Sequence, residues 1–209
     1  MIKNIFPTKI WETTYPGYNK EETVRKFDEY IERVGTNRYN WIIADSDTTA
    51  HPLPPSKETN KYIVDYTDLK LGFGSPELFD WINTQIVEYH KHCGYSRPET
   101  FEIAGAWATS TPKGGYLELH NHNPRITAGV FYVDASSEQG DLHILNPNEM
   151  VIGKNQYYDG YDFPDKWYQF PVQSGKLVLF PGYIYHYVPK NPTENARKII
   201  SFDVIQHHR

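Results

Sequence analysis

The chain has 209 residues, an aromatic share of 15%, a formal net charge of -5 and a single cysteine, Cys93. This length predicts one domain, residues 1–209, and the lack of a basic surplus argues against nucleic acid as the main partner. One cysteine excludes an internal disulfide and any cysteine-built metal site, and no run is apolar enough for a secretory signal or a membrane span. We therefore expect a cytoplasmic protein without a membrane partner.

The first 99 residues predict a strand and two helices. The segment Ile5 to Trp11 is expected to be an edge strand, where two copies of the chain could pair as a homodimer. The first helix has Asn19 as its N-cap and apolar residues at helical spacing, namely Val24, Phe27, Ile31 and Val34, before Gly35. The second begins at Ser75-Pro76 and ends at Gly94, with an apolar stripe of Leu78, Ile82, Ile86 and Tyr89.

Residues Thr36 to Gly74 are rich in Asn, Asp, Thr and Pro, so a long loop or lid is predicted between the two helices. From residue 100 onward, at least seven short β-rich runs follow one another without a helix between them. They are FEIAGAWAT, YLELHNH, ITAGVFYVDA, GDLHIL, WYQFPV, KLVLFP and KIISFDVIQ. This pattern predicts a mainly β fold, an antiparallel jelly-roll barrel over residues 100–209 with the two helices packed on it.

Histidines mark a candidate metal site in this barrel. His120 and His122 are two residues apart at the end of a predicted strand, so both imidazoles would reach one side of it. His186 follows the turn Pro181-Gly182 and is the strongest candidate for a third ligand. His90 and His92 have the same spacing but end a helix, where they diverge, so we expect that pair on the surface.

Arg197 and Ser201 share the parity of one face in the run RKIISFDV. A planar guanidinium binds a carboxylate through two parallel hydrogen bonds, so these two residues are candidates for holding an anionic ligand. The alternative for Arg197 alone is an ordinary surface ion pair.

The order of these motifs resembles that of the 2-oxoglutarate and Fe(II)-dependent dioxygenases. The motifs are HxH with Pro124, then GDLHILNP, then KLVLFPGYIYHYV, then ARKIISFDV. The most similar branch has no assigned substrate and carries HxH where most members have HxD. The resemblance covers roughly Phe101 to Val204 and implies a double-stranded β-helix. It also implies Fe(II) held by His120, His122 and His186, with 2-oxoglutarate and O2 as co-substrates. The metal centre would be the only catalytic group.

The same resemblance implies that Arg197 anchors the distal carboxylate of 2-oxoglutarate with help from Ser201. Tyr116, four residues before His120 and of the same strand parity, could add a hydroxyl or be a packed wall residue. The implied reaction is hydroxylation of an unidentified small molecule or peptide side chain, with release of succinate and CO2. Residues 36–74 and 146–166 are the expected substrate loops. Trp107 is expected to pack the barrel.

Three alternatives remain open at this level. A nearby carboxylate, from Glu118, Asp134 or Asp141, could be the third ligand in place of His122, because a neutral ligand leaves the metal more positive. A cupin-type metalloenzyme is a second possibility, although no carboxylate lies between Asn123 and Ala128. A non-catalytic barrel that binds a sugar or peptide is the third. His143, His207 and His208 are not expected to be ligands.

Overall fold

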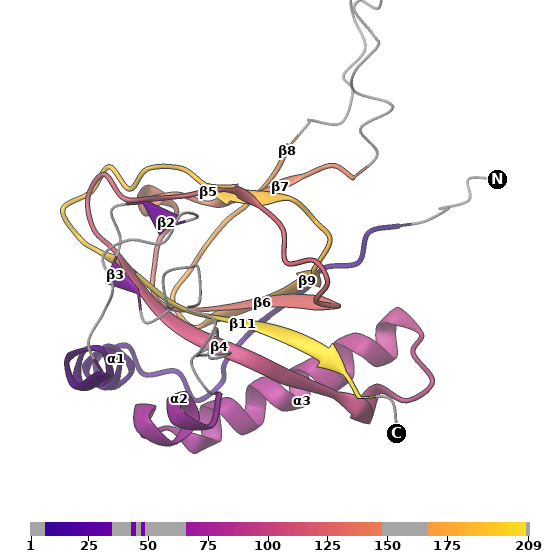
Figure 1. Cartoon of the computed structure of the whole chain (residues 1–209). Coiled ribbons are helices and arrows are strands. Elements are labelled where there is room, and N and C mark those ends of the chain that lie inside the picture. The colour runs from indigo at the N-terminus through magenta and orange to yellow at the C-terminus, as the bar shows by residue number, and fades with distance from the viewer. Residues whose placement is uncertain (1–6, 35–42, 45–46, 49–65, 148–166, 208–209) are drawn as a thin grey trace, which may run out of the picture.

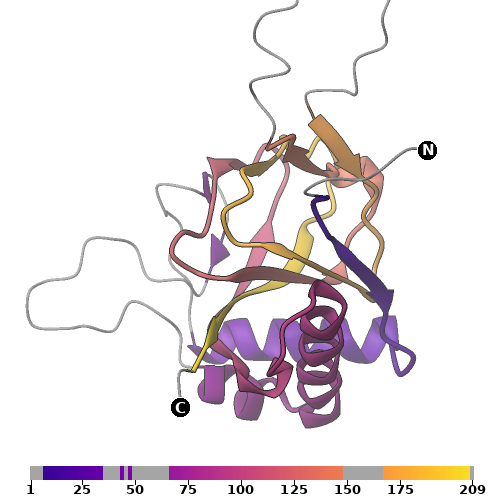
Figure 2. The ribbon, with the colours of Figure 1, turned by 90° about the vertical axis from the view of Figure 1, so that its right-hand side faces the viewer.

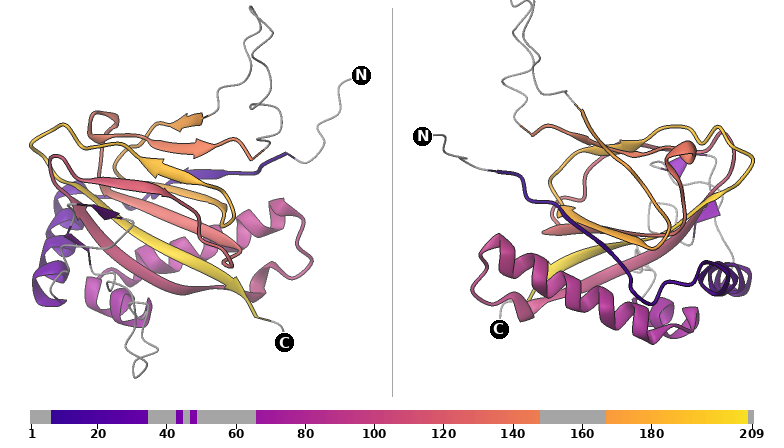
Figure 3. Two further views of the ribbon diagram at one scale, coloured as in Figure 1. Left: turned by 45° about the horizontal axis from the view of Figure 1, so that its top comes forward. Right: turned by 180° about the vertical axis from the view of Figure 1, so that it is seen from behind.

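The computed structural model describes residues 7–34, 43–44, 47–48, 66–147 and 167–207 (Figure 1). Its strands form two antiparallel sheets. The larger sheet has the order β1-β9-β6-β11-β4-β3 and the smaller has the order β2-β5-β10-β7-β8. Figure 3 shows the two sheets stacked over each other, which is the layered arrangement of a jelly roll. The predicted mainly β barrel is thereby confirmed.

All seven predicted β-rich runs contain a strand. They are β4 (Phe101–Thr111), β5 (Tyr116–His120), β6 (Thr127–Asp134), β7 (Leu142–Leu145), β8 (Trp167–Phe170), β9 (Lys176–Pro181) and β11 (Arg197–Gln206). A short strand, β10 (His186–Val188), lies between β5 and β7 in the smaller sheet. Two further pairs of residues, β2 (Ile43–Ala44) and β3 (Asp47–Thr48), add to the sheet edges.

The edge strand near the N-terminus is β1 (Trp11–Thr14), which pairs antiparallel with β9. It begins where the predicted strand Ile5 to Trp11 ends, and residues 7–10 are not in a strand. Residues 5 and 6 lie outside the described residues. The homodimer predicted at this edge stays a prediction.

Both predicted helices are present. In α1 (Lys20–Val34), the side-chain oxygen of Asn19 accepts a hydrogen bond from the backbone N–H of Glu22 at 3.0 Å, as expected of an N-cap. In α3 (Pro76–Cys93), Gly94 ends the helix in the left-handed conformation at φ 92°. The predicted stripe of α3 is buried throughout.

A third helix, α2 (Tyr66–Phe73), lies within the segment predicted to be a loop. Its buried residues Leu69 and Phe73 are four apart, which places them on one face of the helix. The loop prediction was therefore wrong for this part of the segment. The three helices gather on one side of the larger sheet (Figures 1 and 2).

The larger sheet is buried on both faces. One face packs against the helices through residues such as Phe131, Leu179 and Phe202, and the other packs against the smaller sheet through Val130 and Phe180. This explains why the interiors of β6 and β9 form continuous apolar runs, AGVFYV and LVLF, instead of alternating with polar residues. In the part of the chain that the structure describes, no helix is long and apolar enough to cross a membrane.

Candidate metal centre

The three predicted histidines meet between the two sheets. His120 ends β5 and His186 begins β10, and the two residues are direct cross-strand partners with ring centroids 4.2 Å apart. His122 lies two residues beyond β5, and its ring centroid is 5.1 Å from those of both other histidines. The candidate ligand atoms of the three residues lie within 4.8 Å of one another. Two nitrogens that each bind one ion at about 2.1 Å are about 4 Å apart at most, so a small side-chain rotation closes the site.

Each imidazole uses its Nδ1 for a hydrogen bond inside the protein. Nδ1 of His120 lies 2.7 Å from the carbonyl oxygen of Glu118, and Nδ1 of His186 lies 3.0 Å from that of Ile184. A carbonyl oxygen only accepts, so Nδ1 carries the proton in both rings. The Nε2 of each neutral ring then keeps a lone pair for a metal, which is the usual state of a histidine ligand.

Burial keeps these rings neutral. It lowers the pKa of His120 to about 4, helped by the neighbouring His122, and it lowers the pKa of His186 well below its ordinary value. Both rings are therefore uncharged at neutral pH, with a single proton on Nδ1. Neutral imidazoles that carry no proton on the coordinating nitrogen suit a divalent transition metal such as Fe(II).

Backbone contacts hold the two histidine segments together. The turn after β9 places Gly182 against the segment that follows His122, and the N–H of His122 donates to the carbonyl of Gly182 at 2.7 Å. The N–H of Gly182 donates in turn to the carbonyl of Ile126 at 2.8 Å. A Cβ on Gly182 would lie 2.2 Å from the carbonyl oxygen of Arg125. Only glycine allows this approach, which accounts for the Pro-Gly turn before His186.

Arg197 lies on the same inner side of the larger sheet. It is 2% exposed, and its Nη1 donates to the carbonyl oxygen of Gln139 at 3.0 Å and contacts that of Gly140 at 3.4 Å. Burial lowers the pKa of Arg197 to about 10, while Tyr132 favours the charged form, so the guanidinium stays charged at neutral pH. The surface ion pair considered for Arg197 is excluded by this burial.

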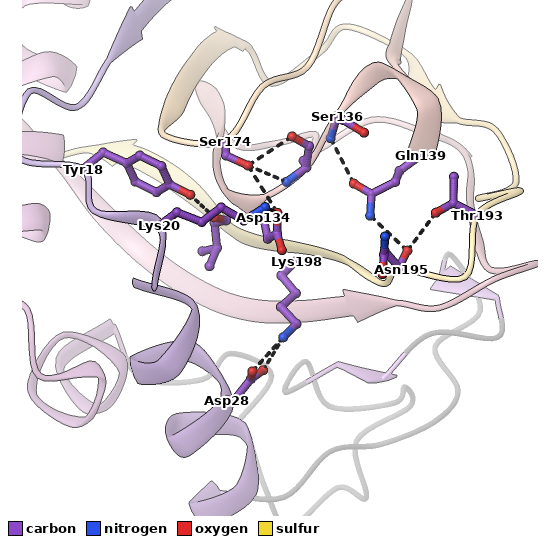
Figure 4. A network of polar contacts seen from close by, with 12 residues as sticks. Tyr18, Lys20, Asp28, Asp134, Ser136, Gln139, Ser174, Thr193, Asn195 and Lys198 are labelled. Atoms are coloured by element: carbon purple, nitrogen blue, oxygen red, sulfur yellow. Dashed lines mark hydrogen bonds and ion pairs between the residues drawn. The ribbon is translucent and has the colours of Figure 1, made fainter. Parts of the chain in front are cut away.

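A polar network fixes the turn that receives Arg197. The side chain of Gln139 accepts from the backbone N–H of Ser136 and donates to the carbonyl of Asn195, both at 2.9 Å (Figure 4). Thr193 donates to the same carbonyl at 3.0 Å. The turn after β6 is thus tied to the loop before β11, and the carbonyls that hold Arg197 have fixed positions.

Ser201 is half-buried and shares the inner face of β11 with Arg197. It lies opposite Val130 of β6 and Trp107 of β4. Val130 belongs to the core between the sheets, so Ser201 faces that space as its parity predicted. Trp107 lies beside the histidines, with its ring 6.1 Å from that of His122, and so borders the candidate site instead of only packing the barrel.

Tyr116 is displaced by an irregularity in β5. The pairing of β5 with β10 shifts register between the pair His120 and His186 and the pair Leu117 and Val188. Because Leu117 and Val188 both contact the core between the sheets, Tyr116 has the opposite orientation to its neighbour Leu117. Its ring instead lies 5.7 Å below the ammonium group of Lys190. The parity argument for Tyr116 was therefore wrong, since it assumed a regular strand.

The candidate carboxylates do not join the histidines. Within the described residues, the metal-ligand cluster holds His120, His122 and His186 and no carboxylate. Glu118 is exposed, Asp134 pairs with Lys20 at 2.8 Å, and Asp141 accepts from Gln169 and the backbone of Val172. His143 stacks on Tyr187, its partner on β10, at 4.7 Å and is not a ligand either.

His90 is buried, contrary to the expected surface position. Its Nε2 lies 2.9 Å from the hydroxyl of Thr127 on β6, and its ring stacks on Phe101 at 3.6 Å. The reason is that α3 packs on the larger sheet to its last turn. His92, by contrast, is exposed.

Two residues at the site were not predicted from the sequence. Asp203 accepts a hydrogen bond from Nδ1 of His122 at 2.6 Å, and Tyr132 is buried close enough to Arg197 to influence its charge. Asp203 continues the alternation of Arg197, Ile199 and Ser201 along β11, so a signal for it was present. Tyr132 lies in an apolar run that gives no hint of a polar role.

The comparisons with known proteins agree with this site. Residues 105–203 match a family model described as "Putative 2OG-Fe(II) oxygenase". That stretch runs from β4 to the inner face of β11 and contains the three histidines, Arg197, Ser201 and Asp203. No curated protein matches the chain.

Solved structures share the fold at low sequence identity. HygX from Streptomyces hygroscopicus, with nickel, 2-oxoglutarate and hygromycin B bound, is 14% identical with a TM-score of 0.59, and the match covers 94% of this chain and 82% of HygX. SnoK, a non-haem α-ketoglutarate-dependent carbocyclase from nogalamycin biosynthesis, is 10% identical with a TM-score of 0.63, covering 95% and 80%. A Trichoplax adhaerens prolyl hydroxylase in complex with a hypoxia-inducible factor peptide fragment is 14% identical with a TM-score of 0.56, covering 94% and 83%.

These structures establish the fold, and the family model establishes the sequence signature. The resemblance indicated by the histidine, Phe-Pro-Gly and arginine motifs is thereby confirmed: residues 105–203 match the family model, and the barrel has the fold of these solved structures.

Proposed function

We propose that the protein is an active oxygenase that uses 2-oxoglutarate, Fe(II) and O2 to hydroxylate a small molecule or a peptide side chain. The observation that carries this proposal is the grouping of three imidazoles, with Nδ1 engaged in each, on the inner side of a barrel that also buries the charged Arg197. The family match supports the same chemistry.

His120, His122 and His186 would hold the metal through Nε2. Three protein ligands leave coordination positions for a co-substrate and for oxygen, as non-haem iron oxygenases require. When bound, Fe(II) and 2-oxoglutarate with O2 supply oxidative decarboxylation to succinate and CO2 together with oxidation of a substrate C–H bond. The protein contributes ligand positions, orientation and a dry environment.

Arg197 would anchor the distal carboxylate of 2-oxoglutarate. Its described hydrogen bonds both come from Nη1, so Nη2 and Nε are available to a carboxylate. Buried Tyr132 and half-buried Ser201 would supply hydroxyls beside it. A buried guanidinium at this place needs a counter-anion, and the co-substrate would provide one.

Apolar side chains would keep water from the reacting centre. Ile144 is the direct cross-strand partner of His186, and Phe180 contacts the His186 ring with a centroid distance of 4.8 Å. Both are buried in the core between the sheets. Such walls would exclude water on the side of His186, which is more deeply buried than His120.

Residues 36–74 and 146–166, which are expected to set substrate choice, lie largely outside the described residues. Structures of the same fold bind hygromycin B or a peptide fragment, which supports a small molecule or peptide side chain here. The helices and the larger sheet share one hydrophobic core, which supports a single domain over the whole chain.

An anaerobic titration tests the proposal. Addition of Fe(II) and then 2-oxoglutarate to the purified protein should produce the visible charge-transfer band of the chelated metal, and His186→Ala should abolish it. Metal binding without the band would favour a cupin-type enzyme. If no divalent metal binds, the barrel is a non-catalytic binding module.

A further inference from the structure

His122 differs from the other two histidines in the partner of its Nδ1. His120 and His186 donate to backbone carbonyls, whereas Nδ1 of His122 lies 2.6 Å from the carboxylate oxygen Oδ1 of Asp203. Under the resemblance described above, His122 stands where most 2-oxoglutarate and Fe(II)-dependent dioxygenases carry an aspartate. A charged partner is therefore found at the position where the anionic ligand is missing.

Asp203 is placed for this contact by the barrel. It lies on the inner face of β11, in the alternation that begins at Arg197, and pairs with Ala128 of β6. The side chains of His122 and Asp203 are 12% and 15% exposed, so the contact is largely shielded from water. The two residues are 81 positions apart in the sequence, and so the contact depends on the closed barrel.

Arg125 is a second neighbour of Asp203 among the described residues, and it is charged. Its Nε lies 3.7 Å from Oδ2, which is an ion-pair distance without the geometry of a hydrogen bond. The arginine side chain is 31% exposed, so this contact is the weaker of the two. Oδ1 thus faces the imidazole of His122, and Oδ2 faces the partly exposed guanidinium of Arg125.

We propose that Asp203 is a positioning residue that fixes the ring and tautomer of His122 and returns to the metal site the negative charge that an HxD motif would supply directly. This inference rests on the proposed function, since it assumes that His122 is a ligand. A carboxylate on Nδ1 holds the proton there, leaves Nε2 free, and makes the imidazole a more basic ligand. The HxH site then retains a divalent metal although all three ligands are neutral.

The test uses Ni(II) binding measured by calorimetry on the full chain. Asp203→Asn keeps an acceptor oxygen but removes the charge, and Asp203→Ala removes both. Loss of such a partner weakens metal affinity by about 10- to 100-fold, so we expect this change for Asp203→Asn and at least as large a change for Asp203→Ala. The matched control is Asp134→Asn. Asp134 lies on the neighbouring strand β6, and its carboxylate pairs with Lys20 of α1, so this variant should bind Ni(II) like the wild type.

A second readout needs no metal. Long-range proton–nitrogen correlation spectra of the metal-free protein report which ring nitrogen of each histidine carries the proton. The wild type should show His122 protonated at Nδ1, and Asp203→Ala should shift it toward Nε2 while His120 and His186 stay unchanged. A purely structural role for Asp203 would lower the melting temperature without this selective change.

The outcomes separate the two claims. If both Asp203 variants bind Ni(II) as tightly as the wild type, or if the tautomer of His122 is unchanged in Asp203→Ala, the role of Asp203 is wrong. If the wild type binds no metal, the proposed function fails, and the spectra of the metal-free protein still decide whether Asp203 holds His122.

Discussion

His120 and His186 are directly opposite each other on the antiparallel strands β5 and β10, with ring centroids 4.2 Å apart. A cross-strand pair of this kind has its geometry set by the backbone hydrogen bonds on both sides. The metal site therefore has one rigid edge, formed by two strands, and one edge in a loop, formed by His122.

We expect His120→Ala and His186→Ala each to abolish binding of Fe(II) or Ni(II), because two imidazoles hold these ions far more weakly than three. Calorimetry measures the binding, and circular dichroism checks the fold. His92→Ala is the matched control, since His92 is exposed and outside the cluster. If both variants bound metal with wild-type affinity, His120 and His186 would not be metal ligands.

Arg197→Met should weaken 2-oxoglutarate binding by at least about 30-fold while metal binding is retained, because truncation leaves the buried carboxylate without its partner. The dissociation constant is measured from the charge-transfer band at increasing 2-oxoglutarate. Lys198→Met is the control, because Lys198 is the next residue on β11 but pairs with Asp28 of α1 on the helix side. An unchanged constant in Arg197→Met would contradict the anchoring role.

Gly182→Ala should destabilise the protein by about 1–3 kcal/mol and also weaken metal binding, since the new methyl group would meet the backbone of Arg125. Chemical denaturation and Ni(II) calorimetry give the two values. Gly72→Ala provides a comparison, because the closest atom there is the end of the flexible Arg33 side chain. Equal behaviour of the two variants would show that the turn tolerates a side chain.

Stability should fall as the pH is lowered from 6.5 toward 4, in part because of His90. Burial lowers the pKa of His90 from 6.5 to about 4, so the unfolded chain binds a proton in this range before the folded protein does. The contribution of His90 is complete above pH 6.5 and amounts to roughly 3 kcal/mol when lost.

His120 and His186 contribute with the same sign in the metal-free protein, since their pKa values are also lowered. The effect of His90 is therefore read as the difference between the wild type and His90→Gln in urea unfolding at pH 7 and pH 5. The variant should lose less stability over this interval. A parallel loss in both proteins would show that His90 does not titrate on unfolding.

Much of this structure could be predicted from local sequence signals. The N-cap at Asn19, the left-handed stop at Gly94 and the strands of the barrel each depend on residues within one turn or one strand. His120 and His122 could be grouped with His186 because the order of the motifs resembles that of a known family. At the N-cap, the helix stop and the strands, the residues within the segment itself favour its conformation.

The features that were missed depend on contacts between distant segments. The irregular pairing that turns Tyr116 away from the site is set by the match between β5 and β10, and the short helix α2 is stabilised by burying Leu69 and Phe73. The contact between His122 and Asp203 joins two different strand regions. The alternation along β11 indicates the face on which Asp203 lies, but no pattern within a single segment gives its contact with His122.

The hydrogen bonds at Gly182 have a consequence for substitutions at position 122. They join the two ligand-bearing segments through main-chain atoms alone, from the N–H of His122 to Gly182 and from Gly182 to Ile126. The frame of the site is thus independent of the side chain at position 122. A change of the side chain at this position, such as aspartate for histidine, would therefore leave these main-chain hydrogen bonds in place.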